Sequence, residues 1–226
     1  TGWNASEWRG IVAQVQAEAA RHGLPPLAVG VDSIHGANYV HEATLFPQQL
    51  GLAATFDVSL ARRMGVVTGK DTRAAGLHWM FSPVLGLGVN PLWSRLYETF
   101  GEDPLLASQM GAAMIGGLQA APEERGLLRA AATMKHFIGY SAPRIGEDRD
   151  GSWLPTRVLL EYFVPPFEAA VKAGVASAME SYGEVNGEPV AASSRLLKGL
   201  LRRRLNFSGL LVTDWAETDN PHYIHA

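Results

Sequence analysis

Residues 209–215 read Gly-Leu-Leu-Val-Thr-Asp-Trp, a short apolar run that ends in a carboxylate and an indole. The same arrangement recurs upstream, where apolar runs at 27–31, 79–82, 133–138 and 175–180 each lead into polar residues. The first of these runs shows no alternation of polar and apolar residues, which is typical of a strand covered on both faces. The pattern predicts five buried strands, each with chemically active residues at its carboxyl end.

Helical segments separate these runs. They are expected near 6–22, with Ser6 as N-cap and Gly23 as the stop, at 57–75, from 103–104 with proline in the first turn, at 156–172 and at 193–204. Strands that alternate with helices predict an α/β fold with a parallel sheet, either doubly wound or closed into a barrel. Polar residues follow every strand, whereas an open sheet concentrates its ligand at a single crevice. We therefore favour a (β/α)8 TIM-type barrel. Eight strands need about 250 residues, so this chain is expected to hold an incomplete or truncated barrel.

Composition narrows the class of protein. A chain of 226 residues that is 47% hydrophobic can bury a globular core. A net charge of -3 gives no indication of a basic surface that would bind nucleic acid. We interpret the basic cluster at 202–204 as the charged end of a helix. No apolar run reaches the roughly 18 residues of a membrane span, and the N-terminus lacks a signal pattern.

Metal and thiol chemistry are not expected. The chain has no cysteine, which excludes disulfides, thiolate metal sites and thiol catalysis. His35 and His41 with Glu42 lack the helical spacing of a zinc protease. We therefore expect neither a metal nor a cofactor.

Three motifs resemble known sites but fail in detail. Residues 65–71 resemble a phosphate loop, but the glycines are too close and Asp71 replaces the hydroxyl that would hold magnesium. Residues 139–143 resemble a serine nucleophile elbow, but Pro143 replaces the final glycine. Residues 86–88 lack the third glycine of a dinucleotide fingerprint. A doubly wound nucleotide-binding domain and a serine hydrolase are accordingly disfavoured.

Asp214 and Trp215 at the end of the last strand suggest sugar chemistry. A carboxylate can form and release a glycosyl ester, and an indole face can stack on the C–H groups of a sugar ring. The alternative is that Asp214 merely caps the next helix, since Asp is among the preferred caps.

Two further groups could bind a polyol. Lys135-His136 at another strand end supplies hydrogen-bond donors, and Arg95 with Glu98 adds a positioned guanidinium. The alternatives are ordinary hydrogen-bonded residues at a strand terminus and a structural ion pair.

Six stretches, taken together, resemble glycoside hydrolase family 3 and run in that family's order over nearly the whole chain. They are Gly-Val-Asp-Ser-Ile-His-Gly at 30–36, Phe-Pro-Gln-Gln-Leu-Gly-Leu-Ala-Ala-Thr at 46–55, Arg-Leu-Tyr-Glu-Thr-Phe-Gly-Glu-Asp-Pro at 95–104, Lys-His-Phe at 135–137, Ser-Tyr-Gly-Glu-Val-Asn-Gly at 181–187, and Val-Thr-Asp-Trp at 212–215. The resemblance implies an N-terminal barrel domain of a retaining, exo-acting hydrolase without any cofactor.

The resemblance also assigns roles to residues. It implies that Asp214 is the nucleophile, that Trp215 forms a wall of the subsite for the terminal sugar and that Asp32 binds distal hydroxyls of that sugar. Further positions that it places around the same pocket are Arg95, Lys135, His136, Arg149, Met179 and Tyr182, with Asn38 as an additional candidate. Donors around Asp214 are expected to keep its carboxylate ionised.

A retaining glycosidase also needs a second carboxyl about 5 to 5.5 Å from the nucleophile to protonate the leaving group. In the family this acid comes from a separate domain after the barrel, and this chain ends 12 residues beyond Asp214. Residues 1–226 are therefore expected to be a partial barrel domain without the acid-bearing C-terminal domain. A further domain or a partner chain would then supply the acid. Glu147 and Glu180 are candidates for a stand-in acid.

The expected substrate is a β-glucoside or β-glucan oligosaccharide, hydrolysed at its terminal non-reducing β-D-glucosyl residue. Asp32 in place of glutamate suggests a glucose-like sugar by similarity to glucosidases, and residues 138–141 depart from the family's N-acetylglucosaminidase branch. The alternative is a carbohydrate-binding or scaffolding fragment that lacks the general acid. The resemblance favours a secreted, periplasmic or lysosome-like location.

Overall fold

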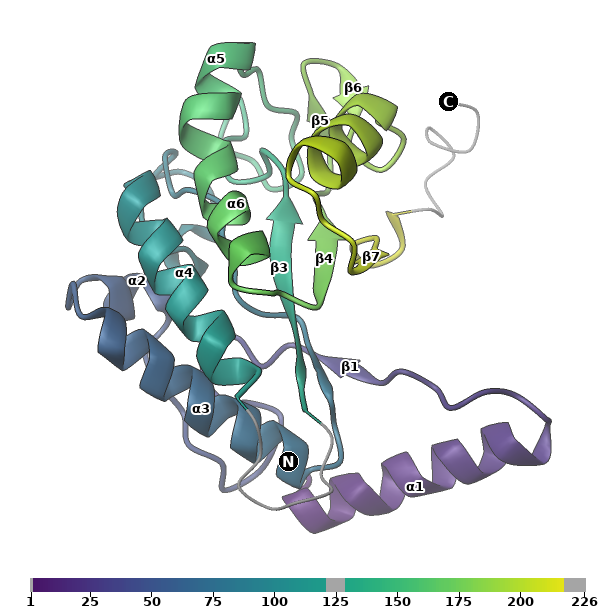
Figure 1. Ribbon diagram of the computed structural model, residues 1–226. Helices are drawn as coiled ribbons and strands as arrows, with labels where there is room; N and C mark the ends of the chain where they lie inside the picture. The colour runs from purple at the N-terminus through teal and green to yellow at the C-terminus, as the bar shows by residue number, and fades with distance from the viewer. Residues whose placement is uncertain (1, 121–128, 218–226) are drawn as a thin grey trace.

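The computed structural model describes residues 2–120 and 129–217 and contains a curled, parallel, five-stranded sheet (Figure 1). Its strands stand in the order β1 (Gly30–Val31), β2 (Trp79–Met80), β3 (Ala131–Phe137), β4 (Ser177–Glu180) and β7 (Leu210–Val212). Every neighbouring pair is parallel. The prediction of five parallel strands is confirmed, although most are shorter than the apolar runs that predicted them. The sheet is part of a barrel, and within the described ranges β1 and β7 are its open edges.

The helices follow the predicted rhythm. They are α1 (Ala5–Arg21), α2 (Gln49–Ala53), α3 (Val58–Ala74), the 3-10 helix η1 (Leu96–Glu98), α4 (Pro104–Leu118), α5 (Thr156–Val158), the π-helix η2 (Leu159–Phe163), α6 (Val164–Lys172) and the π-helix η3 (Ser194–Arg204). In Figure 1, α4 and α6 lie along the same side of the sheet, and α1 projects from its lower end. Helices α4 and α6 therefore cover one face of the sheet (Figure 1).

The first helix begins two residues earlier than predicted. Asn4, not Ser6, is the N-cap, because the Asn4 side chain accepts from the backbone N–H groups of Ser6 and Glu7. The Glu7 carboxylate in turn accepts from the Asn4 N–H at 2.8 Å. This reciprocal capping box satisfies several N–H groups that a helix start leaves free, which fixes the boundary at Asn4.

Glycines let α3 and α4 pack with their backbones in contact. A Cβ added at Gly65 would lie 2.5 Å from the Met114 carbonyl oxygen, and one at Gly117 would lie 2.2 Å from the Arg62 carbonyl oxygen. The glycine spacing at 65–71 that resembles a phosphate loop thus serves helix packing. The prediction that this segment is helical is confirmed.

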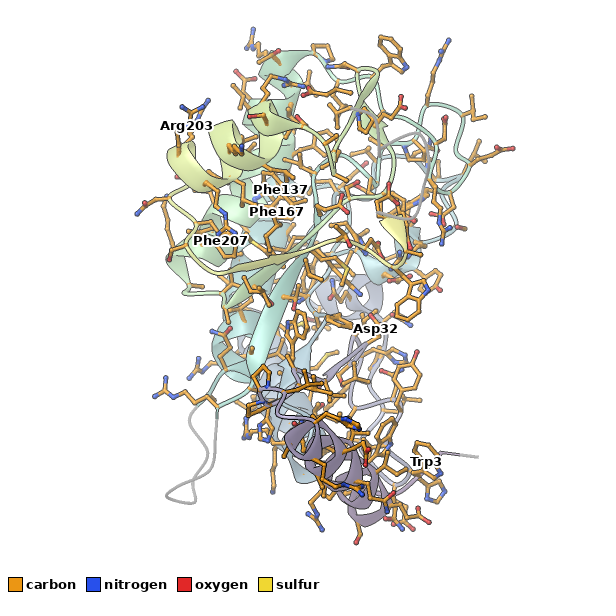
Figure 2. The ribbon with its side chains drawn as sticks, turned by 90° about the vertical axis from the view of Figure 1, so that its right-hand side faces the viewer. Trp3, Asp32, Phe137, Phe167, Arg203 and Phe207 are labelled. Carbon is orange, nitrogen blue, oxygen red and sulfur yellow. The ribbon has the colours of Figure 1, made fainter. Side chains whose placement is uncertain are left out.

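The main core lies between the sheet and its covering helices. Phe137 of β3 meets Phe167 of α6 edge to face with ring centroids 5.2 Å apart, and Phe207 belongs to the same buried cluster. Figure 2 shows these three rings near one another and Asp32 apart from them. The sheet therefore separates the hydrophobic core from the region that contains the polar strand ends.

The basic cluster at 202–204 forms the last turn of η3. Arg202 donates to the carbonyl oxygens of Phe207 at 3.1 Å and Gly209 at 2.6 Å, which ties the helix to the start of β7. Arg203 is exposed and points away from the molecule in Figure 2. The interpretation as a charged helix end is confirmed, with Arg202 as a structural member.

Candidate active site

The carboxyl ends of the parallel strands surround one cavity of about 940 Å³. All nine residues that the resemblance assigns to the site line this cavity: Asp32, Arg95, Lys135, His136, Arg149, Met179, Tyr182, Asp214 and Trp215. Asn38 and Glu98 line it as well. Residues far apart in the sequence thus meet around one cavity, as expected for the mouth of a barrel.

Asp214 is held at the end of β7 by local hydrogen bonds. Its Oδ1 atom accepts from the backbone N–H of Trp215 at 2.7 Å, and its Oδ2 atom lies 3.4 Å from Nε2 of His136. The Tyr182 hydroxyl donates to the Trp215 carbonyl oxygen and so fixes the same turn from the other side. Among the described residues the carboxylate accepts from the adjacent Trp215 N–H, and it faces the cavity at 9% exposure.

Opposing effects act on the pKa of Asp214. Burial raises the pKa of Asp214 above its ordinary value, and the hydrogen bond from Trp215 and the charges of Lys135 and Arg95 only partly oppose this effect. The negative charge of Asp32 adds to the increase in the pKa. The donors act in the expected direction, but loss of hydration outweighs them, because a carboxylate removed from water favours its neutral form.

Lys135 pairs with Asp32 across the cavity floor. Their Nζ and Oδ1 atoms are 2.6 Å apart, and the lysine side chain is almost fully buried. Burial lowers the pKa of Lys135, while the Asp32 charge opposes that change. Burial, with the charges of Lys135 and Arg95, also holds the pKa of His136 well below its usual value, so this ring is neutral. Lys135 and His136 both line the cavity, and the bond to Asp32 fixes the position of the lysine ammonium group.

Arg95 and Glu98 form a two-point ion pair beside the cavity. The Arg95 Nε atom donates to Oε1 of Glu98 at 2.7 Å and its Nη2 atom to Oε2 at 2.8 Å. Burial alone would lower the pKa of Arg95, but this pairing raises it. The structural ion pair considered from the sequence exists, and it also lines the cavity with its guanidinium oriented.

A rim loop at 139–153 carries Arg149. The Arg149 guanidinium lies over the Tyr182 ring, 4.2 Å from its centroid. The end of the loop is tied to the hairpin β5 (Glu184–Val185) and β6 (Glu188–Pro189), because the Ser152 N–H donates to the Glu184 carbonyl oxygen at 2.8 Å. Arg149 thus reaches the cavity from a loop anchored on another loop.

Two residues at the cavity edge have positive φ angles. Arg149 has φ 68° and Ala216 has φ 58°, in the left-handed region that side chains other than glycine rarely adopt. Trp215, immediately before Ala216, is 86% exposed. An indole presented to solvent beside the cavity is a suitable wall for stacking on a sugar ring.

Neither stand-in acid faces the cavity. Glu147 and Glu180 are absent from its lining, and Glu180 is 1% exposed behind Asp214. The described carboxylates that do line the cavity are Asp32, Glu98 and Asp214, and the first two are engaged by cations. A general acid for the leaving group is therefore not found in residues 2–120 and 129–217.

Two tyrosines of the cavity were not predicted. Tyr39 and Tyr97 line it and are about half exposed. Tyr97 lies between Arg95 and Glu98 in the sequence, so the prediction that these two residues belong to the site could have indicated Tyr97 as well. Tyr39 follows Asn38 without any distinguishing pattern. Both rings add apolar surface near the opening.

The remaining motifs have structural explanations. Ser141 is fully buried, and a Cβ at Gly86 would lie 2.9 Å from its hydroxyl oxygen, so this serine is inaccessible as a nucleophile. Within the described parts of the chain, no group of three or more His, Asp or Glu side chains could hold a metal ion. No helix there is both long and apolar enough to cross a membrane.

A parallel strand-and-helix barrel with a cavity at its strand ends is a common architecture of enzymes. The chain belongs to glycosyl hydrolase family 3, because the model of that family's N-terminal domain matches residues 4–224. It is 47% identical to the lysosomal beta glucosidase of Dictyostelium discoideum over 98% of this chain and 28% of that protein.

Solved structures agree with this assignment. The exo-1,3/1,4-beta-glucanase of a Pseudoalteromonas species superimposes with a TM-score of 0.88 at 30% identity, over 96% of this chain and 28% of that one. A beta-glucosidase mutant from Listeria innocua, solved with laminaribiose, gives 0.80 at 34% identity over 86% of this chain and 26% of that one. The chain thus spans less than a third of the length of these relatives.

Proposed function

We propose that this chain forms part of an enzyme that hydrolyses terminal non-reducing β-D-glucosyl residues with retention of configuration, with Asp214 as the nucleophile. The observation that carries the proposal is the position of the Asp214 carboxylate on the same cavity as Lys135, His136 and Arg95. The names of the relatives, which include beta-glucosidases and an exo-beta-glucanase, support the choice of substrate class.

In this proposal the cavity floor binds the hydroxyls of one sugar ring. Asp32 accepts from two adjacent hydroxyls, and Lys135, held by Asp32 at 2.6 Å, donates to the same region. Arg95, oriented by Glu98, and neutral His136 supply further hydrogen bonds. Trp215 stacks on the ring's C–H face from the rim.

The reaction has two steps. An Asp214 oxygen attacks the anomeric carbon, the bond from that carbon to the leaving oxygen breaks, and a proton passes to the leaving oxygen. Water then attacks the same carbon, loses a proton and releases Asp214 as the carboxylate. We propose that the acid and base for both steps is a carboxyl outside the described residues, in a further domain or a partner chain.

A mechanism-based trap tests this proposal. A 2,4-dinitrophenyl 2-deoxy-2-fluoro-β-glucoside needs little acid assistance, because its leaving group is good. Incubation should release dinitrophenol in a burst and leave a fluoroglucosyl ester on the peptide that contains Asp214. The Asp214→Asn variant is the matched control and should give no burst. A label on another residue would reject Asp214 as nucleophile.

The competing function is a carbohydrate-binding or scaffolding module. It predicts binding of laminaribiose to the cavity without any burst or label, so the same experiment separates the two. For location we propose a lysosome-like or extracytoplasmic compartment. The lysosomal relative supports this proposal, and fractionation of cells that express a tagged full-length chain tests it.

A further inference from the structure

The hydrogen-bonded ladder between β4 and β7 stops just before Asp214. Its last pairs are Ala178 with Leu211 and Met179 with Val212. Beyond them the backbone N–H of Asp214 donates to a side chain, the Oε1 atom of Glu180, at 3.1 Å. Glu180 thus replaces a ladder hydrogen bond at the residue where the strand turns into the site.

Glu180 is itself fixed from the opposite side. It is the last residue of β4 and stands in register with Phe137 of β3. The N–H of the next residue, Ser181, donates to the Phe137 carbonyl oxygen at 2.7 Å. The Glu180 side chain therefore spans from the β3–β4 ladder to the backbone of Asp214 and does not depend on the cavity for its position.

The environment of Glu180 favours an uncharged carboxyl. Its Oε2 atom is buried and has no hydrogen-bond partner among the described residues. Burial raises the pKa of Glu180 to about 8, the Asp214 N–H opposes this, and the charges of Glu217 and Asp214 add to it. The basic side chains of β3 face other groups, with the Lys135 cation on Asp32 and the neutral His136 ring on Asp214. A neutral carboxyl can accept the Asp214 N–H without repelling the carboxylate of the same residue.

We infer that Glu180 is a positioning residue for Asp214, which holds the backbone of the attacking residue in place through the Asp214 N–H. The inference rests on the proposed function for the role of Asp214. A shift of about 1 Å in a reacting group can cost about a hundredfold in rate, so one backbone hydrogen bond at this point has a large effect. Glu180 does not touch the substrate, since it is absent from the cavity lining.

Two variants of similar volume test the inference in the full natural chain. Glu180→Gln keeps an oxygen acceptor and stays neutral at every pH, whereas Glu180→Met fills the space but accepts no strong hydrogen bond. Three quantities are measured for each: hydrogen exchange of the Asp214 amide by NMR, the rate of labelling by the fluoroglucoside, and the dissociation constant for that reagent. Near-UV circular dichroism verifies that both variants fold.

At pH 6 the Met variant should exchange its Asp214 amide at least tenfold faster and label about 10- to 100-fold more slowly, with binding changed less than threefold. The Gln variant should match the wild type within about threefold in all three quantities. Above pH 8, where Glu180 ionises beside Asp214 and Glu217, the wild type should label more slowly than the Gln variant.

The inference fails if the Met variant exchanges and labels like the wild type, or if the Gln variant is as impaired as the Met variant. If the wild type is never labelled, the proposed function fails instead. Amide exchange then still decides whether Glu180 holds Asp214, because it requires no chemistry.

Discussion

The contact between α3 and α4 makes a sharp prediction about two adjacent glycines. A Cβ at Gly117 would lie 2.2 Å from the Arg62 carbonyl oxygen and 2.8 Å from the Val66 nitrogen, both backbone atoms of α3. A Cβ at the neighbouring Gly116 would meet only the Arg62 Nη1 atom, at 2.9 Å. The first contact can be relieved only by moving a helix, and the second by rotating one flexible side chain.

The magnitudes follow from this difference. Replacing glycine by alanine inside a helix gains at most about 1 kcal/mol from backbone entropy. Overpacking against a rigid neighbour costs about 1–3 kcal/mol. Gly117→Ala should therefore lower the free energy of unfolding by up to about 2 kcal/mol, whereas Gly116→Ala should leave it unchanged or raise it by up to about 1 kcal/mol.

Urea unfolding of the full natural chain, followed by circular dichroism at constant pH, measures both variants. The decisive quantity is the difference between the two free energies of unfolding, expected at about 2 kcal/mol with Gly117→Ala as the less stable variant. Equal stability of the two variants would refute the reasoning, because it would mean that the backbones of α3 and α4 do not approach closely at Gly117.

Three further predictions concern the site. Because the pKa of Glu180 rises from 4.5 to about 8 on folding, the folded state retains a proton that the unfolded chain loses, so stability falls as pH rises between those values. Glu180→Gln removes this loss. In urea unfolding, the free energy of unfolding of the variant minus that of the wild type should therefore be a few kcal/mol larger at pH 8 than at pH 5. Lys135→Met leaves Asp32 without its buried partner and should weaken laminaribiose binding, measured by calorimetry, at least about tenfold. An unchanged affinity would count against the proposed role of Lys135. Trp215→Ala should weaken the same binding by about 1 kcal/mol, yet leave the unfolding free energy within about 0.5 kcal/mol, since the ring is 86% exposed.

The sequence carried enough information to predict the arrangement of the strands. Apolar runs that end in polar residues predict parallel strands with one active edge, and Asp32, Lys135 and Asp214 do meet there. This works because parallel strands share a direction, so that residues at their carboxyl ends converge irrespective of their distance in sequence.

Other features depend on quantities that a linear pattern does not contain. The pKa of Asp214 rises because burial has a larger effect than the nearby donors and cations, which lower it. Neither the depth of burial nor the distances to those groups can be read from residue order. The hairpin of β5 and β6 was not predicted, although Asn186-Gly187 is a favoured hairpin turn, because its strands have two residues each. The close approach at Gly117 is a property of two helices together and is invisible in either sequence alone.

The rim loop is anchored at several points, which limits the part of it that can change freely. The loop is fastened at its far end, where Ser152 and Leu154 bond the hairpin through Glu184 and Asn186. Asp148 inside the loop also accepts from Nε1 of Trp93 at 3.0 Å and from the Tyr140 hydroxyl at 2.7 Å, and Asn90 donates to the Pro143 carbonyl oxygen at 2.9 Å. The part of the loop between these contacts, 144–147, can therefore vary most freely. Engineering a new preference for the group beyond the first sugar would accordingly begin with grafts into 144–147, which keep Arg149 at the cavity.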